Sequence, residues 1–359
     1  MKRIVLVSFV AFVALFSLSA GVMAGETPKK VRLRMPVCIP TKFPLINFIP
    51  YFAEQVELAS NGTIQFKIYE PGQLIPAFEI QEAVSKGQIE CGWSAAVYIS
   101  GQIPAASLFT TVPFGPDLVE YIAWFYYGNG RKLYQEMYDK YGFNVKVWPM
   151  LMVPMETGGW FRKPIKSVAD FKGMRLRWPG LGGKVLSKLG ASISTIPGGE
   201  IFPSLEKGVI DGTEFGPPVL DAAVGFWKVA KYNYFPGWHQ TCTAMEFTMN
   251  KDTWNKLSKG QQAIIELAVT DINIRGVANA ESRVGKILME NAQKRGVKNM
   301  VYPPEVLKAL QKAWLEVVAE ESAKDPFFKK VWQDLNGFMK EYEVMQSVGY
   351  KALPPQKFE

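Results

Sequence analysis

Residues 170–180 read DFKGMRLRWPG, and residues 181–215 read LGGKVLSKLGASISTIPGGEIFPSLEKGVIDGTEF. This stretch predicts a strand, a glycine-rich turn, a helix, a second strand, a second helix and a third strand, in that order. Arg177 lies at the end of the first of these strands, and Glu214 lies at the end of the last. Open α/β sheets bind their ligands at strand ends. We therefore expect a small anion and a cation to meet between these two side chains.

The composition is that of a globular protein. The chain has 359 residues, of which 48% are hydrophobic and 21% are charged, and this length suits two lobes. Its formal net charge of +8 falls to +6 without Lys2 and Arg3, because 39 basic residues then face 33 acidic ones. The basic residues are spread along the chain without a long run, so the pattern indicates no nucleic-acid partner.

The first 24 residues have the pattern of a secretory signal peptide. Lys2 and Arg3 give a positive start, an apolar run covers residues 4–18, and residues 22–24 (VMA) form a small-residue cleavage site. The apolar run is shorter than the ~20 residues of a membrane span, and no cysteine follows it as a lipid anchor. We expect export and cleavage after Ala24. An uncleaved membrane anchor is the alternative.

Three cysteines are present, at Cys38, Cys91 and Cys242, so at least one must stay unpaired within the chain. A bridge between Cys38 and Cys91 would suit an oxidising compartment. Three small buried thiols are the alternative. No C-x-x-C motif occurs, so the spacing indicates neither a redox site nor a zinc site.

Predicted strands and helices alternate in two halves. In the first half we expect strands at residues 31–38, 63–69, 89–95 and 143–152, and helices at residues 47–59, 79–86 and 118–141. In the second half we expect further strands at residues 157–162, 232–236, 244–249 and 298–302. Strand–helix alternation predicts parallel sheets. Strands 232–236 and 244–249 return toward the first half, so the pattern favours two α/β lobes that form a hinged clamp around a cleft.

Three long helices complete the predicted architecture. The first covers residues 261–294 after a Ser258 cap, the second covers 304–321, and the third is amphipathic and covers 325–345. The apolar face of the last helix predicts packing against its own body or against a second subunit. We expect lobe 1 of the mature chain to comprise residues 25–150 and about 241–285, and lobe 2 to comprise residues 151–240 and about 286–325. Residues 326–359 are expected to form a C-terminal helical extension.

Signatures of enzymes are mostly absent. The chain has one histidine, His239, which excludes a centre with several histidine ligands, and it has no H-E-x-x-H or G-x-S-x-G motif. The glycines of residues 180–183 match neither a P-loop nor G-x-G-x-x-G, because Val185 stands where the last glycine is required. His239 next to Trp238 is more typical of a structural side chain than of a catalytic one.

Four polar residues are candidates for binding an anion and a cation. Arg177 can bind a carboxylate with two parallel hydrogen bonds, and the glycine turn and helix start that follow it add backbone N–H donors. Glu156, Glu214 and Gln240 lie beside aromatic residues or glycines, and their oxygens suit a hard cation such as Na⁺ or Ca²⁺. The alternatives are a surface arginine and three unrelated polar residues.

Six motifs follow one another through the mature chain. They are YEPGQLIPAFEIQEAVSKGQIECG at 69–92, VPFG at 112–115, GGWFRKPIKSVADFKG at 158–173, PGLGGKVL at 179–186, PGGEIFPSLEKGVIDGTEF at 197–215 and VAKYNYFPGWHQ at 229–240. This ordered set resembles the DctP-type solute-binding proteins of tripartite ATP-independent periplasmic (TRAP) transporters. Within that family it resembles the branch that binds 2-oxo acids or lactate together with a metal ion. The resemblance implies a two-lobed, type II-like α/β periplasmic binding protein fold with a long helix that spans both lobes.

The resemblance also implies roles for individual residues. The carboxylate-binding arginine of the family falls on Arg177. The metal ligands of the branch fall on Glu156, on Glu214, on the backbone carbonyl of Phe215 and on Gln240. Glu156 and Phe215 are then expected to contact the substrate as well.

The chain departs from the branch at three of these positions. The branch usually has Gln where Glu156 stands, Glu where Gln240 stands and Trp where Phe215 stands. The first two changes keep two carboxylates and one amide, so the site charge is expected to be preserved. The smaller ring of Phe215 predicts a roomier pocket. Tyr98, in the segment AAVYISG, is the first-lobe candidate for a hydrogen bond to the ligand.

The function implied by the resemblance is binding and not catalysis. The expected ligand is a small monocarboxylate such as pyruvate or lactate, held with a bridging Na⁺ or Ca²⁺ and delivered to TRAP membrane subunits. The expected compartment is the periplasm, and the expected assembly is a homodimer that exchanges its final helices. The alternatives are a binding protein for dicarboxylates or sugar acids, a binding protein that reports to a receptor, and an enzyme with Glu156 and Glu214 as a carboxylate pair.

Overall fold

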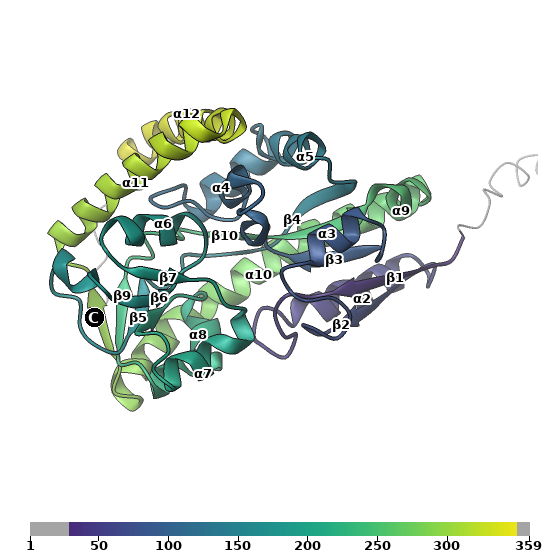
Figure 1. The fold of residues 1–359 in the computed structure, drawn as a ribbon. Helices are drawn as coiled ribbons and strands as arrows, with labels where there is room; N and C mark the ends of the chain where they lie inside the picture. The colour runs from purple at the N-terminus through teal and green to yellow at the C-terminus, as the bar shows by residue number, and fades with distance from the viewer. Residues whose placement is uncertain (1–28, 350–359) are drawn as a thin grey trace, which may run out of the picture.

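The computed structural model describes residues 29–349 and has two lobes of α/β structure (Figure 1). The predicted signal peptide and residues 350–359 of the predicted helical extension lie outside this range. Every helix within residues 29–349 is too short or too polar to span a bilayer.

The first lobe combines strands from both halves of the chain. Its strands are β1 (Val31–Pro36), β2 (Ile64–Tyr69), β3 (Cys91–Ser94), β4 (Val145–Val153) and β10 (Thr243–Asn250). β1 and β2 are parallel, and a parallel bridge between Val37 and Trp93 joins them to β3. The alternation of strands and helices therefore predicts these pairings correctly. β10 arrives from the second lobe and runs antiparallel to both β3 and β4.

The helices of the first lobe are α2 (Phe48–Ala59), α3 (Ile80–Ser85), α4 (Leu118–Tyr126), α5 (Gly130–Lys140) and α9 (Lys251–Asn255). The predicted helical structure of residues 118–141 is present, but it is divided into two helices, because α4 ends at Tyr126 and α5 begins at Gly130. The intervening Gly128-Asn129-Gly130 sequence is a turn signal. Short 3₁₀ helices in the two lobes are η1 (Ala96–Ile99), η2 (Pro104–Phe109), η3 (Val168–Phe171), η4 (Gly198–Glu200) and η5 (Phe226–Lys228).

The second lobe is built on a mixed six-stranded sheet. In spatial order its strands are β11 (Lys298–Val301), β9 (Tyr232–Phe235), β5 (Gly159–Phe161), β8 (Gly212–Thr213), β6 (Arg175–Arg177) and β7 (Ser192–Ser194). β6 and β8 are parallel, with Arg177 paired to Thr213. Because parallel strands end at the same edge of a sheet, this register places the side chain of Arg177 beside Glu214.

The helices of the second lobe are α6 (Gly180–Lys188), α7 (Ile201–Glu206) and α8 (Pro218–Val224). The sequence pattern predicts α6 and α7 but not α8. α8 begins at Pro218, directly after Pro217, and is capped by Gly225, so it is too short to show a clear apolar period.

Two segments of chain cross between the lobes side by side. Residues 154–158 lead from β4 to β5, and residues 236–242 lead from β9 to β10. The backbone N–H of Glu156 donates to the carbonyl of Gln240 at 3.2 Å. Their approach requires glycine at position 237, since a Cβ atom there would lie 2.3 Å from the carbonyl oxygen of Glu156.

Three long helices connect the lobes on the outside. α10 (Lys259–Lys294) begins with the predicted Ser258 cap and contacts β4 and α2 in one lobe and α8 and β11 in the other. α11 (Pro304–Lys324) packs on α6, whereas α12 (Pro326–Val348) packs on α4 and α5 (Figure 1). Asp334 of α12 accepts a hydrogen bond from the indole N–H of Trp124 at 2.8 Å. The final helix therefore packs on its own body, one of the two arrangements that its apolar face predicts.

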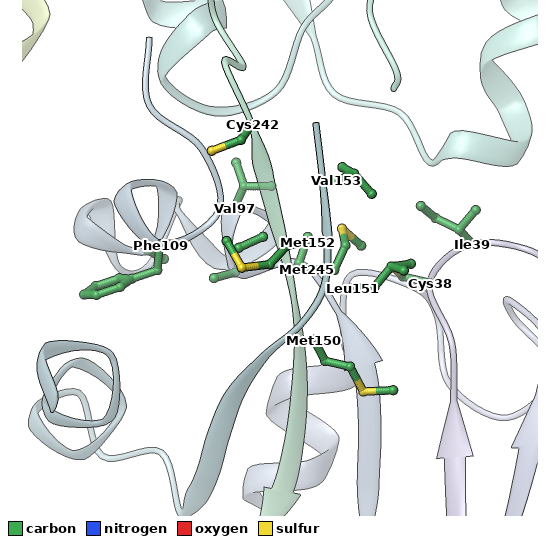
Figure 2. Packing of buried hydrophobic residues seen from close by; sticks show 14 of the residues in the cluster. Cys38, Ile39, Val97, Phe109, Met150, Leu151, Met152, Val153, Cys242 and Met245 are labelled. Atoms are coloured by element: carbon green, nitrogen blue, oxygen red, sulfur yellow. The ribbon is translucent and has the colours of Figure 1, made fainter. Parts of the chain in front are cut away.

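Buried side chains of β4 and β10, the first-lobe strands next to the crossing segments, belong to the hydrophobic core. Figure 2 shows Met152 and Met245 in this region, together with Cys38 and Cys242. All three cysteines of the chain are buried free thiols, so the structure has the unbridged arrangement.

The core of the first lobe holds a fully buried carboxyl group, Glu246 on β10. The hydroxyls of Tyr134 and Tyr138 and the amide of Gln81 donate hydrogen bonds to it at 2.5, 2.8 and 2.9 Å. Burial raises the pKa of Glu246, although these hydrogen bonds act to lower it. The folded protein therefore holds this proton more tightly than the unfolded chain does.

We predict that Glu246→Gln changes the pH dependence of stability. A raised folded-state pKa favours the folded protein in acid, and this advantage is lost as pH rises through the unfolded and then the folded pKa. The melting temperature of Glu246→Gln relative to wild type should therefore increase as pH rises above the usual value of about 4.5.

Glu90→Gln is the matched control, because the pKa of Glu90 is shifted in the other direction. Burial raises the pKa of Glu90, but the hydrogen bonds and the charge of Arg34 together outweigh burial and lower it. The melting temperature of Glu90→Gln relative to wild type should instead fall as pH rises toward the usual value of about 4.5, and should stay level above it. Thermal melting followed by circular dichroism at several pH values measures both variants. A pH-independent difference for Glu246→Gln would contradict the prediction.

Candidate functional site

One cavity between the lobes is lined by all the binding residues that the sequence predicts. Its volume is about 60 Å³, which suits a ligand of few heavy atoms. The predicted residues that line it are Tyr98, Glu156, Arg177, Glu214, Phe215 and Gln240. The remaining lining residues are Ile39, Ala95, Val97, Thr110, Thr111, Pro179, Thr243 and Met245. Figure 2 shows Ile39, Val97 and Met245 among the buried apolar side chains, so the wall of the cavity is continuous with the core.

Arg177 at the end of β6 is buried and only partly hydrogen-bonded. Its Nε donates to the carbonyl of Ile196 at 3.2 Å. Its Nη1 donates to the carboxylate of Glu214 at 2.5 Å and to the backbone carbonyl of the same residue at 3.1 Å. Nη2 forms no hydrogen bond to any residue between 29 and 349, so one edge of the guanidinium can accept an anion.

Glu214 has partners at both carboxylate oxygens. Arg177 contacts Oε1, and the side-chain amide of Gln240 donates to Oε2 at 2.9 Å. Burial raises the pKa of Glu214, but the charge of Arg177 and the neighbouring polar side chains together outweigh burial, and the pKa is lowered overall. Glu214 is therefore the ionised carboxylate of the cavity.

Glu156 lies on the crossing segment of residues 154–158, and its pKa is shifted in the direction opposite to that of Glu214. Burial raises its pKa well above the usual range, and the charge of Glu214 raises it further. The hydroxyl of Thr243 lies 2.8 Å from Oε1 of Glu156 and 2.6 Å from Oε1 of Gln240. A protonated Glu156 can donate to Thr243, which then donates to Gln240, so these polar groups form one chain that ends at Glu214.

The donor set fits a hard cation. Oε2 of Glu156 is buried without a hydrogen-bond partner, although a carboxylate oxygen normally has one. Among residues 29–349, Glu156, Glu214 and His239 form a group whose possible ligand atoms all lie within 4.8 Å of one another. Carboxylate and amide oxygens are the ligands that Na⁺ and Ca²⁺ prefer. A cation at this position would also offset the buried negative charge.

Three polar residues around the site are not among the binding residues that the sequence predicts. Nε2 of His239 lies 3.6 Å from Oε2 of Glu214, and burial lowers the pKa of the imidazole, so it is neutral. Thr243 joins Glu156 to Gln240, and Asp221 on α8 is fully buried next to Thr157. His239 precedes Gln240 directly, which is a usable signal. Thr243 and Asp221 carry no local signal, because their partners are distant in sequence.

The substrate-facing wall is largely apolar. The phenol of Tyr98 forms no hydrogen bond to any residue of the described chain, so its hydroxyl is free to bond a ligand. The ring of Phe215 lies 5.9 Å from the guanidinium carbon of Arg177 and packs against Phe226. A Cβ atom on Gly198 would lie 2.5 Å from this ring, so the ring fills the space beside η4.

Two α/β lobes around a buried arginine and a set of oxygen donors define a solute-binding protein of the two-lobed type. Residues 38–325 match the family described as bacterial extracellular solute-binding protein, family 7 (DctP), and the chain belongs to this family. Proteins of this family are solute-binding components of TRAP transporters. The fold and the family that the sequence motifs predict are thus confirmed.

Three similar proteins are described with small carboxylate ligands. A monocarboxylate 2-oxoacid-binding periplasmic protein of Nostoc sp. (strain PCC 7120) is 34% identical over 323 residues, which cover 90% of this chain and 87% of that protein. A TRAP solute-binding protein from Pseudoalteromonas atlantica T6c, solved with bound sodium and pyruvate, is 32% identical with a TM-score of 0.86. The match covers 90% of this chain and 98% of that chain.

A third similar protein binds a divalent ion. The TRAP solute-binding protein from Bordetella bronchiseptica RB50 is a mixed-occupancy dimer with calcium and picolinate in one active site. It is 32% identical with a TM-score of 0.87, and the match covers 90% of this chain and 96% of that chain. Similar proteins therefore hold either cation together with a small carboxylate.

We predict that removing the charge of Arg177 destabilises the protein even without any ligand. Arg177→Met leaves Glu214 buried without its cation, and removing one partner of a buried ion pair costs about 3–5 kcal/mol. Glu214→Gln in the Arg177→Met background should recover most of this loss, because no uncompensated charge remains. Urea unfolding of the single and double variants, without added ligand and after chelation, measures both effects. Equal stabilities of Arg177→Met and wild type would contradict the prediction.

Proposed function

We propose that this protein is the periplasmic binding component of a TRAP transporter for a small 2-oxo or 2-hydroxy monocarboxylate. It captures the acid together with a bridging Na⁺ or Ca²⁺ and delivers it to membrane subunits. The observation that carries the proposal is the small cavity in which the free edge of Arg177 faces the same space as the carboxyl groups of Glu156 and Glu214. Relatives with about one third identity bind pyruvate or 2-oxo acids.

In this proposal the two ends of the ligand are recognised by different groups. The ligand carboxylate pairs with Nη2 of Arg177, which keeps its Nη1 on Glu214. Glu156, Glu214, Gln240 and the carbonyl of Phe215 hold the cation. The cation supplies positive charge for the 2-oxo or 2-hydroxy oxygen and for the ligand carboxylate. Tyr98 donates a hydrogen bond from the first lobe.

The small cavity favours short acids over larger ones. A volume of about 60 Å³ and the apolar side chains of Ile39, Val97 and Met245 leave room for a short alkyl group and offer it no hydrogen bonds. Dicarboxylates and sugar acids would need further polar partners on this wall. We therefore favour pyruvate and its near homologues as ligands over dicarboxylates and sugar acids.

Several further properties belong to the same proposal. The signal-peptide pattern of residues 1–24 supports export to the periplasm with cleavage after Ala24. A homodimer is supported by the dimer of the Bordetella relative and by the apolar face of α12, although α12 packs on α4 and α5 of its own chain. In the division into lobes that the sequence predicts, α12 belongs to the C-terminal helical extension of residues 326–359.

The enzyme alternative has one observation in its favour. The pKa values of Glu156 and Glu214 are driven in opposite directions, as in pairs of carboxyl groups that act as acid and base. The DctP family consists of transport proteins, so we favour binding. Recovery of pyruvate unchanged after prolonged incubation with the protein supports binding, whereas steady formation of a product would support the enzyme.

We predict that pyruvate and a cation stabilise the mature protein only in combination. A ligand at 100 times its Kd adds about 2.7 kcal/mol to stability when it binds only the folded state. Melting curves with pyruvate, 2-oxobutyrate or lactate, each in Na⁺, in Ca²⁺ and after chelation in Na⁺-free buffer, measure the effect. A shift without cation dependence would remove the metal from the proposal. No shift with any of these acids would overturn the ligand class.

The contact between the lobes depends on Gly180 at the start of α6. Its φ of +64° lies in the left-handed region, and a Cβ atom there would be 2.6 Å from Cγ2 of Val97 in the other lobe. A methyl group at position 180 therefore opposes the approach of the lobes directly.

We predict that Gly180→Ala weakens pyruvate binding about tenfold, since overpacking costs about 1–3 kcal/mol and 1.4 kcal/mol corresponds to a factor of ten. Val97→Ala removes the opposing methyl group, so Gly180→Ala should have a smaller effect in that background. Isothermal titration calorimetry of the four proteins in this cycle measures the coupling. Equal effects in both backgrounds would show that the strained φ, and not the lobe contact, is responsible.

A further inference from the structure

Asp221 is a buried acidic side chain in the second lobe to which neither the sequence nor the proposed binding scheme gives a role. It lies in the first turn of α8 with an exposed fraction of 0%. No Lys, Arg or His nitrogen of residues 29–349 lies within ion-pair distance of its carboxylate, and Oδ1 has no hydrogen-bond partner. A buried acid without a cation is costly for a protein to keep. Its neighbours indicate what it does.

The other oxygen of Asp221 is held by two donors. The hydroxyl of Thr157 donates to Oδ2 at 3.1 Å, and the indole N–H of Trp160 donates to the same oxygen at 2.7 Å. Trp160 belongs to β5, so this bond orients the carboxylate against the sheet. Thr157 directly follows Glu156, so the other bond reaches the crossing segment that carries a proposed cation ligand.

Asp221 is also tied rigidly to the second ligand-bearing segment. From Phe215 the chain runs through Gly216 and Pro217 to Pro218, the first residue of α8, and Pro217 has φ −65°. Prolines fix the backbone, so the path from Phe215 to Asp221 has little freedom. The backbone N–H of Thr157 donates to the carbonyl of Gly216 at 3.4 Å. Thr157 therefore joins both segments, through its backbone at Gly216 and through its side chain at Asp221.

We infer that Asp221 is a positioning residue for the cation: through Thr157 it fixes the segment of Glu156 against the segment of Glu214 and Phe215. This inference rests on the proposed function. A ligand set for a metal ion tolerates little error in spacing, and partners that orient the ligands typically change metal affinity 10- to 100-fold when they are lost. Asp221 acts behind the ligands and does not itself reach the cation.

Four substitutions separate positioning from general stability. Thr157→Val has nearly the same shape and removes the hydroxyl donor, whereas Thr157→Ser keeps the donor and serves as the rescue. Trp160→Phe removes the other donor to the same carboxylate oxygen, which comes from β5 and not from the Glu156 segment, and is the control for destabilisation alone. Asp221→Asn keeps an acceptor oxygen for both donors and replaces the acid by an amide of nearly the same shape.

The test is calorimetric titration of Ca²⁺ in saturating pyruvate, well below the melting temperature of each protein. The melting temperature without ligand or cation is recorded beside it. Thr157→Val should raise the Kd for Ca²⁺ about 10-fold or more, Thr157→Ser should restore it to within about 3-fold, and Trp160→Phe should lower the melting temperature with a much smaller change in Kd. Asp221→Asn should change the Kd less than Thr157→Val does, because burial raises the pKa of Asp221 well above its usual range and the amide keeps an acceptor oxygen for Thr157.

Each outcome decides between the inference and the function on which it rests. If wild type shows no Ca²⁺-dependent pyruvate binding, the proposed function fails. If wild type binds and Thr157→Val binds Ca²⁺ equally well, the positioning role of Asp221 is overturned while the function stands. If Thr157→Val and Trp160→Phe change the Kd by the same factor, Asp221 is a structural residue only.

Discussion

The buried ion pair of Arg177 and Glu214 is the interaction on which the ligand cavity depends. Parallel pairing of β6 and β8 puts both residues at one edge of the sheet. The pair keeps Glu214 ionised and leaves the neighbouring Glu156 to take up a proton. Desolvation offsets most of the attraction in a buried ion pair, so such a pair adds little to stability by itself. Its position at the cavity is better explained by binding than by folding.

The crossing segments make the site sensitive to the arrangement of the lobes. Glu156 and Gln240 stand on the two crossings, Arg177 and Glu214 belong to the second lobe, and Tyr98 belongs to the first. A ligand that contacts all three regions favours the arrangement in which the lobes meet, since it binds that arrangement with more contacts. α10 and the pair α11 and α12 link the lobes on the outside, so the lobes can move only as far as these helices allow.

Polar side chains behind the cavity hold its carboxyl groups in place by hydrogen bonds. Thr243 connects Glu156 to Gln240, and Thr157 connects the Glu156 segment to Asp221. These hydroxyls can donate or accept, so they adapt to either protonation state of the neighbouring carboxyl group. The buried carboxyl groups of the site are therefore held in place by neutral side chains, while Arg177 supplies the positive charge.

The sequence by itself determined the family, the order of most strands and helices, and six of the residues that line the cavity. Local signals suffice for these, because strand ends, glycine turns and ordered motifs are read over a few residues. Only the tertiary structure decided that β10 runs antiparallel, that residues 118–141 form two helices, and that His239, Thr243 and Asp221 surround the site. Their partners lie at distant positions in the chain, such as Thr157 for Asp221. Burial and the charge of Arg177, not residue type, separate the pKa values of Glu156 and Glu214, and burial exists only once the lobes have folded.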